Sequence, residues 1–191
     1  MTSATKRLRA NNTILLVIDM QDKLLAKVPT THDLTRATAL LLDVAALLGV
    51  PVLATEQYPK GLGPTSPEIA ARIHQPITPK TVFSCCGAGT FLEELELLQR
   101  PNVVLAGIET HVCVMQTALD LIEAGLHVFI PVDAVEARFH LDHHYAIRRM
   151  ELAGGIPTTA EAVVFEWIAD AAHPQFKAFS KLIVERTTQS Q

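Results

Sequence analysis

The chain has 191 residues, enough for one domain with one substantial hydrophobic core. Its 16 basic and 20 acidic side chains give a net charge of −4, and no basic run follows residue 10, which argues against nucleic acid or an anionic membrane surface as the main partner. The first residues lack the apolar segment of a signal peptide, and three cysteines, two of them adjacent, make a poor disulfide framework. We therefore expect a cytoplasmic protein that does not enter a membrane.

Short apolar runs alternate along the chain with longer segments in which apolar residues recur at helical spacing. The expected strands are 13–19, 50–55, 81–84, 102–107 and 126–134, with a short candidate at 156–160. The expected helices are 33–49, 90–99, 111–125, 141–155, 161–171 and 174–185. A turn-rich loop at 57–68 separates the second strand from the third.

This alternation predicts right-handed crossovers between parallel strands. The expected fold class is a three-layer α/β/α arrangement with a doubly wound, mostly parallel, Rossmann-like sheet of about six strands. We expect a flexible N-terminus at 1–12, a single domain at 13–186 and a polar tail at 187–191. Because ligands of such sheets bind beyond the carboxyl ends of the strands, the polar residues at those ends are the candidates for function.

Two residues at such ends and a nearby lysine suggest a nucleophilic site. Asp19 closes the first strand, Lys80 stands just before the third, and Cys113 lies where a helix begins. Taken singly, they are typical of a capping carboxylate, a solvated lysine and an inert buried thiol. Taken together, Asp19 can accept the thiol proton, the Lys80 ammonium can hold the two negative groups together, and helix N–H groups can stabilise an oxyanion. The helix dipole should also favour the thiolate of Cys113 over the thiol. Spacing alone does not show that the three residues meet.

The segments "LLVIDMQ" and "AGIETHVCV", with the lysine ahead of "TVFS", resemble the isochorismatase-like cysteine hydrolases. The resemblance covers almost the whole chain and, through "TEQYPKGLGPTSPE" and "DAAHPQFKAFSKLIVE", is strongest to the isochorismatase domain-containing proteins. It implies a catalytic triad of Asp19, Lys80 and Cys113 and no cofactor. It also implies a non-proline cis peptide between Ile108 and Glu109, and an oxyanion site made by the backbone N–H groups of Glu109 and Cys113.

The sequence departs from the metal-using members of this family. The nicotinamidases carry an Asp-x-His pattern and a further histidine after the second strand, whereas at that place this chain has Glu56 and no histidine until His74. No metal site is therefore expected. His140, His143 and His144 have helical spacing that could bind a metal, but a solvated outer face is the preferred interpretation. True isochorismatases lack the nucleophilic cysteine, so its presence argues against vinyl-ether hydrolysis.

The substrate pocket is expected to be small and of mixed polarity. Its predicted lining residues are Gln21, Gln57, Tyr58, Phe83 and Cys86. Many relatives have Ala-Phe where this chain has Cys85 and Cys86, which should reshape the pocket and could bring a second thiol near Cys113. Two small residues in a tight turn before Gly87 explain the cysteine pair equally well.

The sequence thus predicts a cysteine hydrolase that cleaves a small amide, ureido or related acyl compound through a thioester. Two alternatives stay open: a binding or thiol-sensing protein that keeps the fold without turnover, and a metal-assisted amidase of the nicotinamidase type. The expected partners are a small-molecule substrate and further copies of the chain. The family often assembles through helices that flank the sheet, so we expect a dimer or a larger homo-oligomer.

Overall fold

The protein is built on a central parallel sheet. The structure, a computed structural model, describes residues 6–188. The sheet has the strand order β3-β2-β1-β4-β5-β7, with β6 paired to β4, and all of these pairings are parallel. The strands are β1 (Thr13–Ile18), β2 (Val52–Gln57), β3 (Thr78–Lys80), β4 (Asn102–Ile108), β5 (His127–Pro131), β6 (Val135–Glu136) and β7 (Ile156–Thr158).

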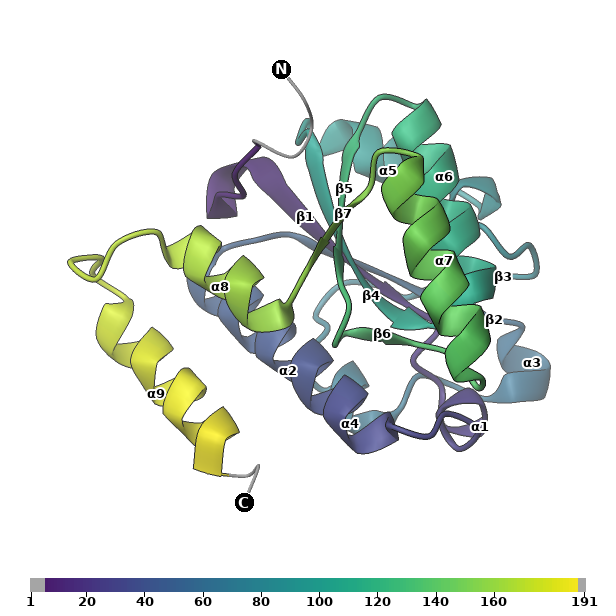
Figure 1. The fold of residues 1–191 in the computed structure, drawn as a ribbon, viewed down its shortest axis with the longest axis horizontal. Helices are drawn as coiled ribbons and strands as arrows, with labels where there is room; N and C mark the ends of the chain where they lie inside the picture. Colours follow the sequence, from purple (N-terminus) through teal and green to yellow (C-terminus); the bar gives the residue numbers. More distant parts are fainter. Residues whose placement is uncertain (1–5, 189–191) are drawn as a thin grey trace.

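Helices cover both faces of this sheet, as Figure 1 shows. They are α1 (Asp22–Leu25), α2 (Thr31–Leu48), α3 (Pro59–Leu62), α4 (Pro67–Ala70), α5 (Phe91–Leu97), α6 (Met115–Glu123), α7 (His140–Leu152), α8 (Ala160–Ile168) and α9 (Phe176–Thr188). Two short 3-10 turns, η2 (Ala10–Asn12) and η3 (Cys85–Gly87), and one π-helical turn, η4 (Thr110–Val114), complete the described elements. The expected three-layer α/β/α fold is confirmed.

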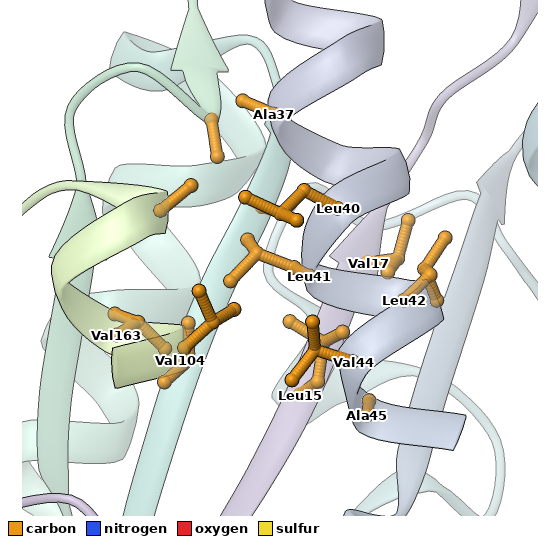
Figure 2. Packing of buried hydrophobic residues seen from close by; sticks show 14 of the residues in the cluster. Leu15, Val17, Ala37, Leu40, Leu41, Leu42, Val44, Ala45, Val104 and Val163 are labelled. Carbon is orange, nitrogen blue, oxygen red and sulfur yellow. The ribbon is translucent and has the colours of Figure 1, made fainter. Parts of the chain in front are cut away.

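The two central strands are buried on both faces, which explains their continuous apolar sequences. Every residue of β1 and of β4 is buried. Alternate side chains of β1 enter different cores: Leu15 and Val17 pack with α2 and α8, whereas Ile14, Leu16 and Ile18 pack with α5, α6 and α7. Figure 2 shows α2 lying over Leu15 and Val17.

Helix α2 and the C-terminal helices form the layer on the first of these faces. The predicted apolar face of α2 is buried at Leu34, Ala37, Leu41 and Ala45. Side chains of β4 and α8 close the same core, as Figure 2 shows for Val104 and Val163. Helix α9 adds Phe179, which is 1% exposed and packs edge to face on Phe165 of α8 with 5.0 Å between the ring centroids.

The third strand lies earlier in the chain than predicted. Strand β3 pairs in register with Thr55–Gln57 of β2, and the predicted strand 81–84 consists of bends. Val82 and Phe83 are 45% and 53% exposed, so the apolar residues that suggested a buried strand face outward. The prediction was wrong because a strand needs backbone partners as well as apolar residues, and pairing with β2 stops at Lys80.

Other predicted boundaries shift by smaller amounts. The run 126–134 divides into β5 and β6, and the turn-rich loop 57–68 contains the single-turn helices α3 and α4. Leu8 is buried and its N–H donates to Glu166 Oε2 at 2.7 Å, so the packed part of the chain begins before residue 13. Residues 1–5 of the predicted N-terminal segment and 189–191 of the predicted tail lie outside the described residues.

Among residues 6–188, no helix combines the length and the apolar character that crossing a bilayer requires.

Candidate active site

Asp19, Lys80 and Cys113 come together at the carboxyl edge of the sheet. Asp19 directly follows β1, Lys80 ends β3, and Cys113 lies in η4, the turn that leads from β4 into α6. Because β3, β2, β1 and β4 are consecutive neighbours in the sheet, the ends of these strands lie side by side. The three residues are only 0%, 4% and 5% exposed.

The side chain of Lys80 connects the other two. Its Nζ donates to Asp19 Oδ2 at 2.6 Å and lies 3.4 Å from Cys113 Sγ. The second carboxylate oxygen, Asp19 Oδ1, accepts a hydrogen bond from Thr55 Oγ1 at 2.8 Å. Both oxygens of Asp19 are therefore held by defined donors, and the carboxylate cannot rotate freely beside the thiol.

The backbone of the strand ends is fitted closely around this carboxylate. Asp19 has φ of 54°, in the left-handed region, and its N–H donates to the carbonyl of Thr55 at 3.1 Å. Gly107 of β4 lies beside Ile18 of β1, and a Cβ on Gly107 would lie 2.0 Å from the carbonyl oxygen of Ile18. Only glycine permits this approach, which places β4 and its following turn next to Asp19.

Lys80 is an ammonium in this environment. Burial is the largest single cause and lowers the pKa of Lys80, but the opposing causes, led by the negative charge of Asp19, together raise the pKa above its ordinary value. Lys80 therefore stays protonated near neutral pH and presents a positive charge to Asp19 and Cys113.

Cys113 is a thiol at rest, contrary to the expected thiolate. Burial is the largest cause that raises the pKa of Cys113, to about 12, and the carboxylate of Asp19 acts in the same direction through its charge and a hydrogen bond. Lys80 opposes them without reversing the shift. The helix dipole was expected to favour the thiolate, but burial outweighs it. Cys113 also lies within the π-helical turn, and α6 itself begins only at Met115. Chemistry at this sulfur would therefore require a neighbouring group that removes the thiol proton.

The turn before Cys113 begins with the expected cis peptide. The Ile108–Glu109 peptide bond is cis. The side chain of Glu109 points to Arg138, whose Nε donates to Glu109 Oε1 at 2.7 Å, so its carboxylate is neutralised beside the site. The carbonyl of Glu109 accepts from the N–H of Val112 at 3.0 Å, which fixes the start of η4.

The residues predicted to line a pocket occupy different environments. Gln21 is fully buried, and its side-chain amide binds the backbone of Gln57 and the carbonyl of Gly63. Tyr58 and Phe83 are about half exposed, and Cys86 is half-buried. A cavity of about 360 Å³ beside β3 is lined in part by Tyr58, Lys60, Lys80 and Val82.

The second thiol near the site belongs to Cys85, not to Cys86. Cys85 is fully buried, with its Sγ 3.6 Å from Thr55 Oγ1 and its N–H donating to Thr117 Oγ1 at 2.9 Å. Thr117 Oγ1 in turn donates to the carbonyl of Cys113 at 2.7 Å. Burial raises the pKa of Cys85, and it raises the pKa of Cys86 to about 11. Neither thiol is activated at neutral pH.

The histidines of α7 belong to a different cluster. His140 and His144 are exposed, whereas His143 is half-buried, with Nδ1 lying 3.0 Å from Thr110 Oγ1 and 3.3 Å from Glu136 Oε1. Among residues 6–188, no group of three or more His, Cys, Asp or Glu side chains is arranged to hold a metal ion.

The sequence did not identify Thr55 as a site residue, and it gave Gln57 only a place in the pocket wall. Thr55 and Gln57 both lie on β2 and bind Asp19 and Lys80 directly. The sequence does hint at both residues in "ATEQ", where an apolar strand ends in side chains that can donate and accept hydrogen bonds. Only the pairing of β2 with β1 and β3 shows which partners these side chains meet.

Comparisons with known proteins agree with this architecture. The sequence model of the isochorismatase domain family matches residues 13–162. Isochorismatase domain-containing protein 2 of Macaca fascicularis is 43% identical over 182 residues, which cover 94% of this chain and 86% of that protein.

Solved structures give the same result. A protein named MAR1 ribonuclease from Caenorhabditis elegans is 42% identical with a TM-score of 0.88, over 94% of this chain and 93% of that one. The YcaC gene product of Escherichia coli, described as an octameric hydrolase of unknown specificity, is 25% identical with a TM-score of 0.84, over 96% of this chain and 97% of that one. The similarity therefore spans the sheet, both helical layers and the turn that carries Cys113.

Proposed function

The chain belongs to the isochorismatase-like hydrolase family, and on that premise we propose that it is a cysteine hydrolase that cleaves a small amide, ureido or related acyl substrate through a thioester on Cys113. The observation that carries this proposal is the buried contact of three groups: Lys80 Nζ lies 2.6 Å from Asp19 Oδ2 and 3.4 Å from Cys113 Sγ. A carboxylate, an ammonium and a thiol in this arrangement can transfer a proton and stabilise the resulting sulfur anion.

The first half of the reaction forms the thioester. As Cys113 Sγ attacks the substrate carbonyl, its proton passes to the carboxylate of Asp19, and the carbonyl oxygen becomes an oxyanion. The backbone N–H groups of Glu109 and Cys113 are the proposed donors to this oxygen. When the carbon–nitrogen bond breaks, the leaving amine takes the proton from Asp19. The ammonium of Lys80 keeps its charge throughout.

The second half releases the acid. Water gives a proton to Asp19 as its oxygen attacks the thioester carbon, and the carbon–sulfur bond then breaks. The sulfur of Cys113 recovers its proton from Asp19, which returns the site to the neutral thiol that its raised pKa favours. A resting thiol also protects Cys113 from reagents that do not occupy the site, because the thiolate is the reactive form.

We propose that this reaction needs no metal or cofactor. At the place where nicotinamidases carry the Asp-x-His pattern, the only side chain of this chain that could bind a metal is Glu56. It accepts hydrogen bonds from the N–H and the hydroxyl of Thr65 at 2.6 and 2.8 Å. It is therefore engaged in holding the loop after β2. Activity that persists in the presence of a chelator would support this part of the proposal.

RNA is the substrate class named for the C. elegans neighbour, and we infer that it is not the substrate of this chain. The net charge is −4, and the ammonium that lies closest to Cys113 is already paired with Asp19. Cleavage of a labelled RNA oligonucleotide that Cys113→Ala abolishes would overturn this inference.

We further propose a cytoplasmic homo-oligomer. The octameric description of the E. coli neighbour supports assembly, and the 63% and 67% exposure of Phe139 and Leu141 at the start of α7 leaves apolar surface that a second copy can cover. Light scattering at several protein concentrations measures the mass of the particle in solution.

The decisive experiment for the hydrolase is intact-protein mass spectrometry after acid quench. The protein is incubated with a panel of small amides, carbamates and ureido compounds, and release of ammonia or amine is measured in parallel. We expect an adduct with the mass of one acyl group, absent in Cys113→Ala and strongly reduced in Asp19→Asn. If no member of the panel gives an adduct or a product, the protein is better described as a binding or thiol-sensing relative on the same fold.

A further inference from the structure

We propose that Gln57 is a positioning residue that fixes the direction of the Lys80 ammonium, so that one of its N–H groups is kept available for the sulfur of Cys113. The proposal rests on the proposed function only in taking Cys113 as the nucleophile. The sequence placed Gln57 in the wall of the pocket, whereas the structure places its side-chain oxygen 2.6 Å from Lys80 Nζ.

The backbone of Gln57 is held by its strand pairing and by the side chain of Gln21. Gln57 is the last residue of β2 and lies in register with Lys80 of β3, so the two side chains leave neighbouring strands at the same level. Gln21 binds both of its backbone groups: Gln21 Oε1 accepts from the N–H of Gln57 at 2.8 Å, and Gln21 Nε2 donates to its carbonyl at 3.0 Å. A second bond from Gln21 Nε2, to the carbonyl of Gly63 at 2.6 Å, fixes Gln21 itself.

The side chain of Gln57 can be oriented in only one way. Its Nε2 donates to the carbonyl of Thr81 at 2.8 Å. An amide nitrogen only donates and an amide oxygen only accepts, so this bond turns Oε1 toward Lys80. Lys80 Nζ also only donates, which excludes the flipped amide on that side as well.

The ammonium of Lys80 has more hydrogen-bond acceptors around it than N–H groups to donate. Its ammonium carries three N–H groups. The acceptors within 3.4 Å are Asp19 Oδ2 and Gln57 Oε1, both at 2.6 Å, and then Phe83 O at 3.1 Å, Val82 O at 3.4 Å and Cys113 Sγ at 3.4 Å. The two short bonds use two N–H groups, and because the ammonium is tetrahedral they set the direction of the third. That third N–H is left for the two carbonyls and the sulfur.

The sulfur depends on this arrangement more than the oxygens do. A neutral thiol is the weakest acceptor of the five, so at rest it cannot hold the ammonium in place by itself. The thiolate that forms during the reaction needs an N–H already directed at it, because a donor that must first reorient gives less stabilisation. Gln57 Oε1 also lies 3.9 Å from Cys113 Sγ, within reach of the resting S–H. Gln57 thus contacts the ammonium and the thiol at the same time.

The test uses the pH dependence of alkylation at Cys113, which requires no substrate. Iodoacetamide is added to the whole protein between pH 7 and pH 11, and modification of each cysteine is followed by peptide mass spectrometry. Gln57→Met has a similar length without the acceptor. We expect its Cys113 to react about threefold to fourfold more slowly at each pH, the effect of a pKa raised by about one unit after allowance for the higher nucleophilicity of the more basic sulfur. The matched control is Gln116→Met on the exposed side of α6, where no change is expected.

A double variant distinguishes positioning from a general structural effect. In a Lys80→Met background, Gln57→Met should change the alkylation of Cys113 much less, because Gln57 acts mainly through the ammonium and only its longer contact with the thiol remains. Equal slowing with and without Lys80 would overturn the proposal, and so would unchanged or faster alkylation in the single variant. If Gln57→Met does not fold, Gln57→Asn keeps the amide but is too short to reach Lys80, and it should give the same slowing.

The two proposals can fail separately. A protein that forms no acyl adduct with any amide can still show the expected effect of Gln57 on its thiol, and in that case only the hydrolase proposal is lost. A working hydrolase whose Cys113 alkylation does not respond to Gln57→Met would lose only the positioning role.

Discussion

Replacing Lys80 by methionine tests how much the ammonium contributes to ionisation of Cys113. With Nζ 3.4 Å from Sγ and an effective dielectric constant of about 20, an ammonium and a thiolate attract each other by about 5 kcal/mol. Water that enters the altered site screens the remaining charges, so we expect roughly half of this energy to be lost, or about two units of pKa. The freed carboxylate of Asp19 raises the pKa of Cys113 in the same direction.

The consequence is measured as the rate of alkylation. Because the pKa of Cys113 is already about 12, the native thiol should react slowly with iodoacetamide at pH 8, and its rate should rise about tenfold per pH unit up to pH 11. In Lys80→Met the thiolate is about a hundredfold scarcer but more nucleophilic, which leaves a net slowing of about tenfold at any pH in this range.

Two controls accompany this assay. Lys80→Arg keeps a positive charge and should slow alkylation much less, while Lys27→Met on the exposed surface should leave it unchanged. Urea unfolding identifies variants that lose the fold, since removing one partner of a buried ion pair costs about 3–5 kcal/mol. Alkylation of a folded Lys80→Met protein at the native rate or faster would refute the electrostatic role given to Lys80.

Three further predictions concern stability and the neighbours of Asp19. Because the pKa of Cys113 is raised, the unfolded chain binds fewer protons than the native protein above pH 9. The free energy of unfolding should therefore fall from pH 9 to pH 12. In urea titrations, Cys113→Ala should reduce the slope of this fall by about 1.4 kcal/mol per pH unit. Gly107→Ala places a Cβ 2.0 Å from the carbonyl oxygen of Ile18 and should cost at least 2–4 kcal/mol or prevent folding, and a native urea midpoint would contradict the close approach. Thr55→Val removes the donor to Asp19 Oδ1 and should slow acyl-enzyme formation about tenfold while the urea midpoint changes little; equal acylation rates would show that Lys80 alone orients the carboxylate.

The sequence predicted the elements whose patterns depend on burial alone. The continuous apolar runs of β1 and β4 indicate strands covered on both faces, and the spacing of apolar residues in α2 indicates the face that packs on them. It misplaced β3, because the apolar residues Val82 and Phe83 lie on the surface while Thr78–Lys80 makes the backbone pairs. Apolar character did not indicate burial here, and only pairing with β2 defines this strand.

Asp19 and Cys113 could also be named from the sequence, since they stand at a strand end and at a helix start, where function concentrates. Lys80, expected before a strand, was named for the charge that it adds to them and through the family resemblance. Which of these side chains are ionised could not be predicted from the sequence. The helix dipole suggested a thiolate at Cys113, but burial and the adjacent Asp19 raise its pKa to about 12, and both effects depend on neighbours that are distant in the chain. The role of Gln57 was also hidden, because a glutamine at the end of a strand has no defined partner until β2 lies between β1 and β3. Residue type and order thus determine which chemical groups reach this edge of the sheet, and the tertiary structure decides their charge and their contacts, because both depend on distance and on exclusion of water.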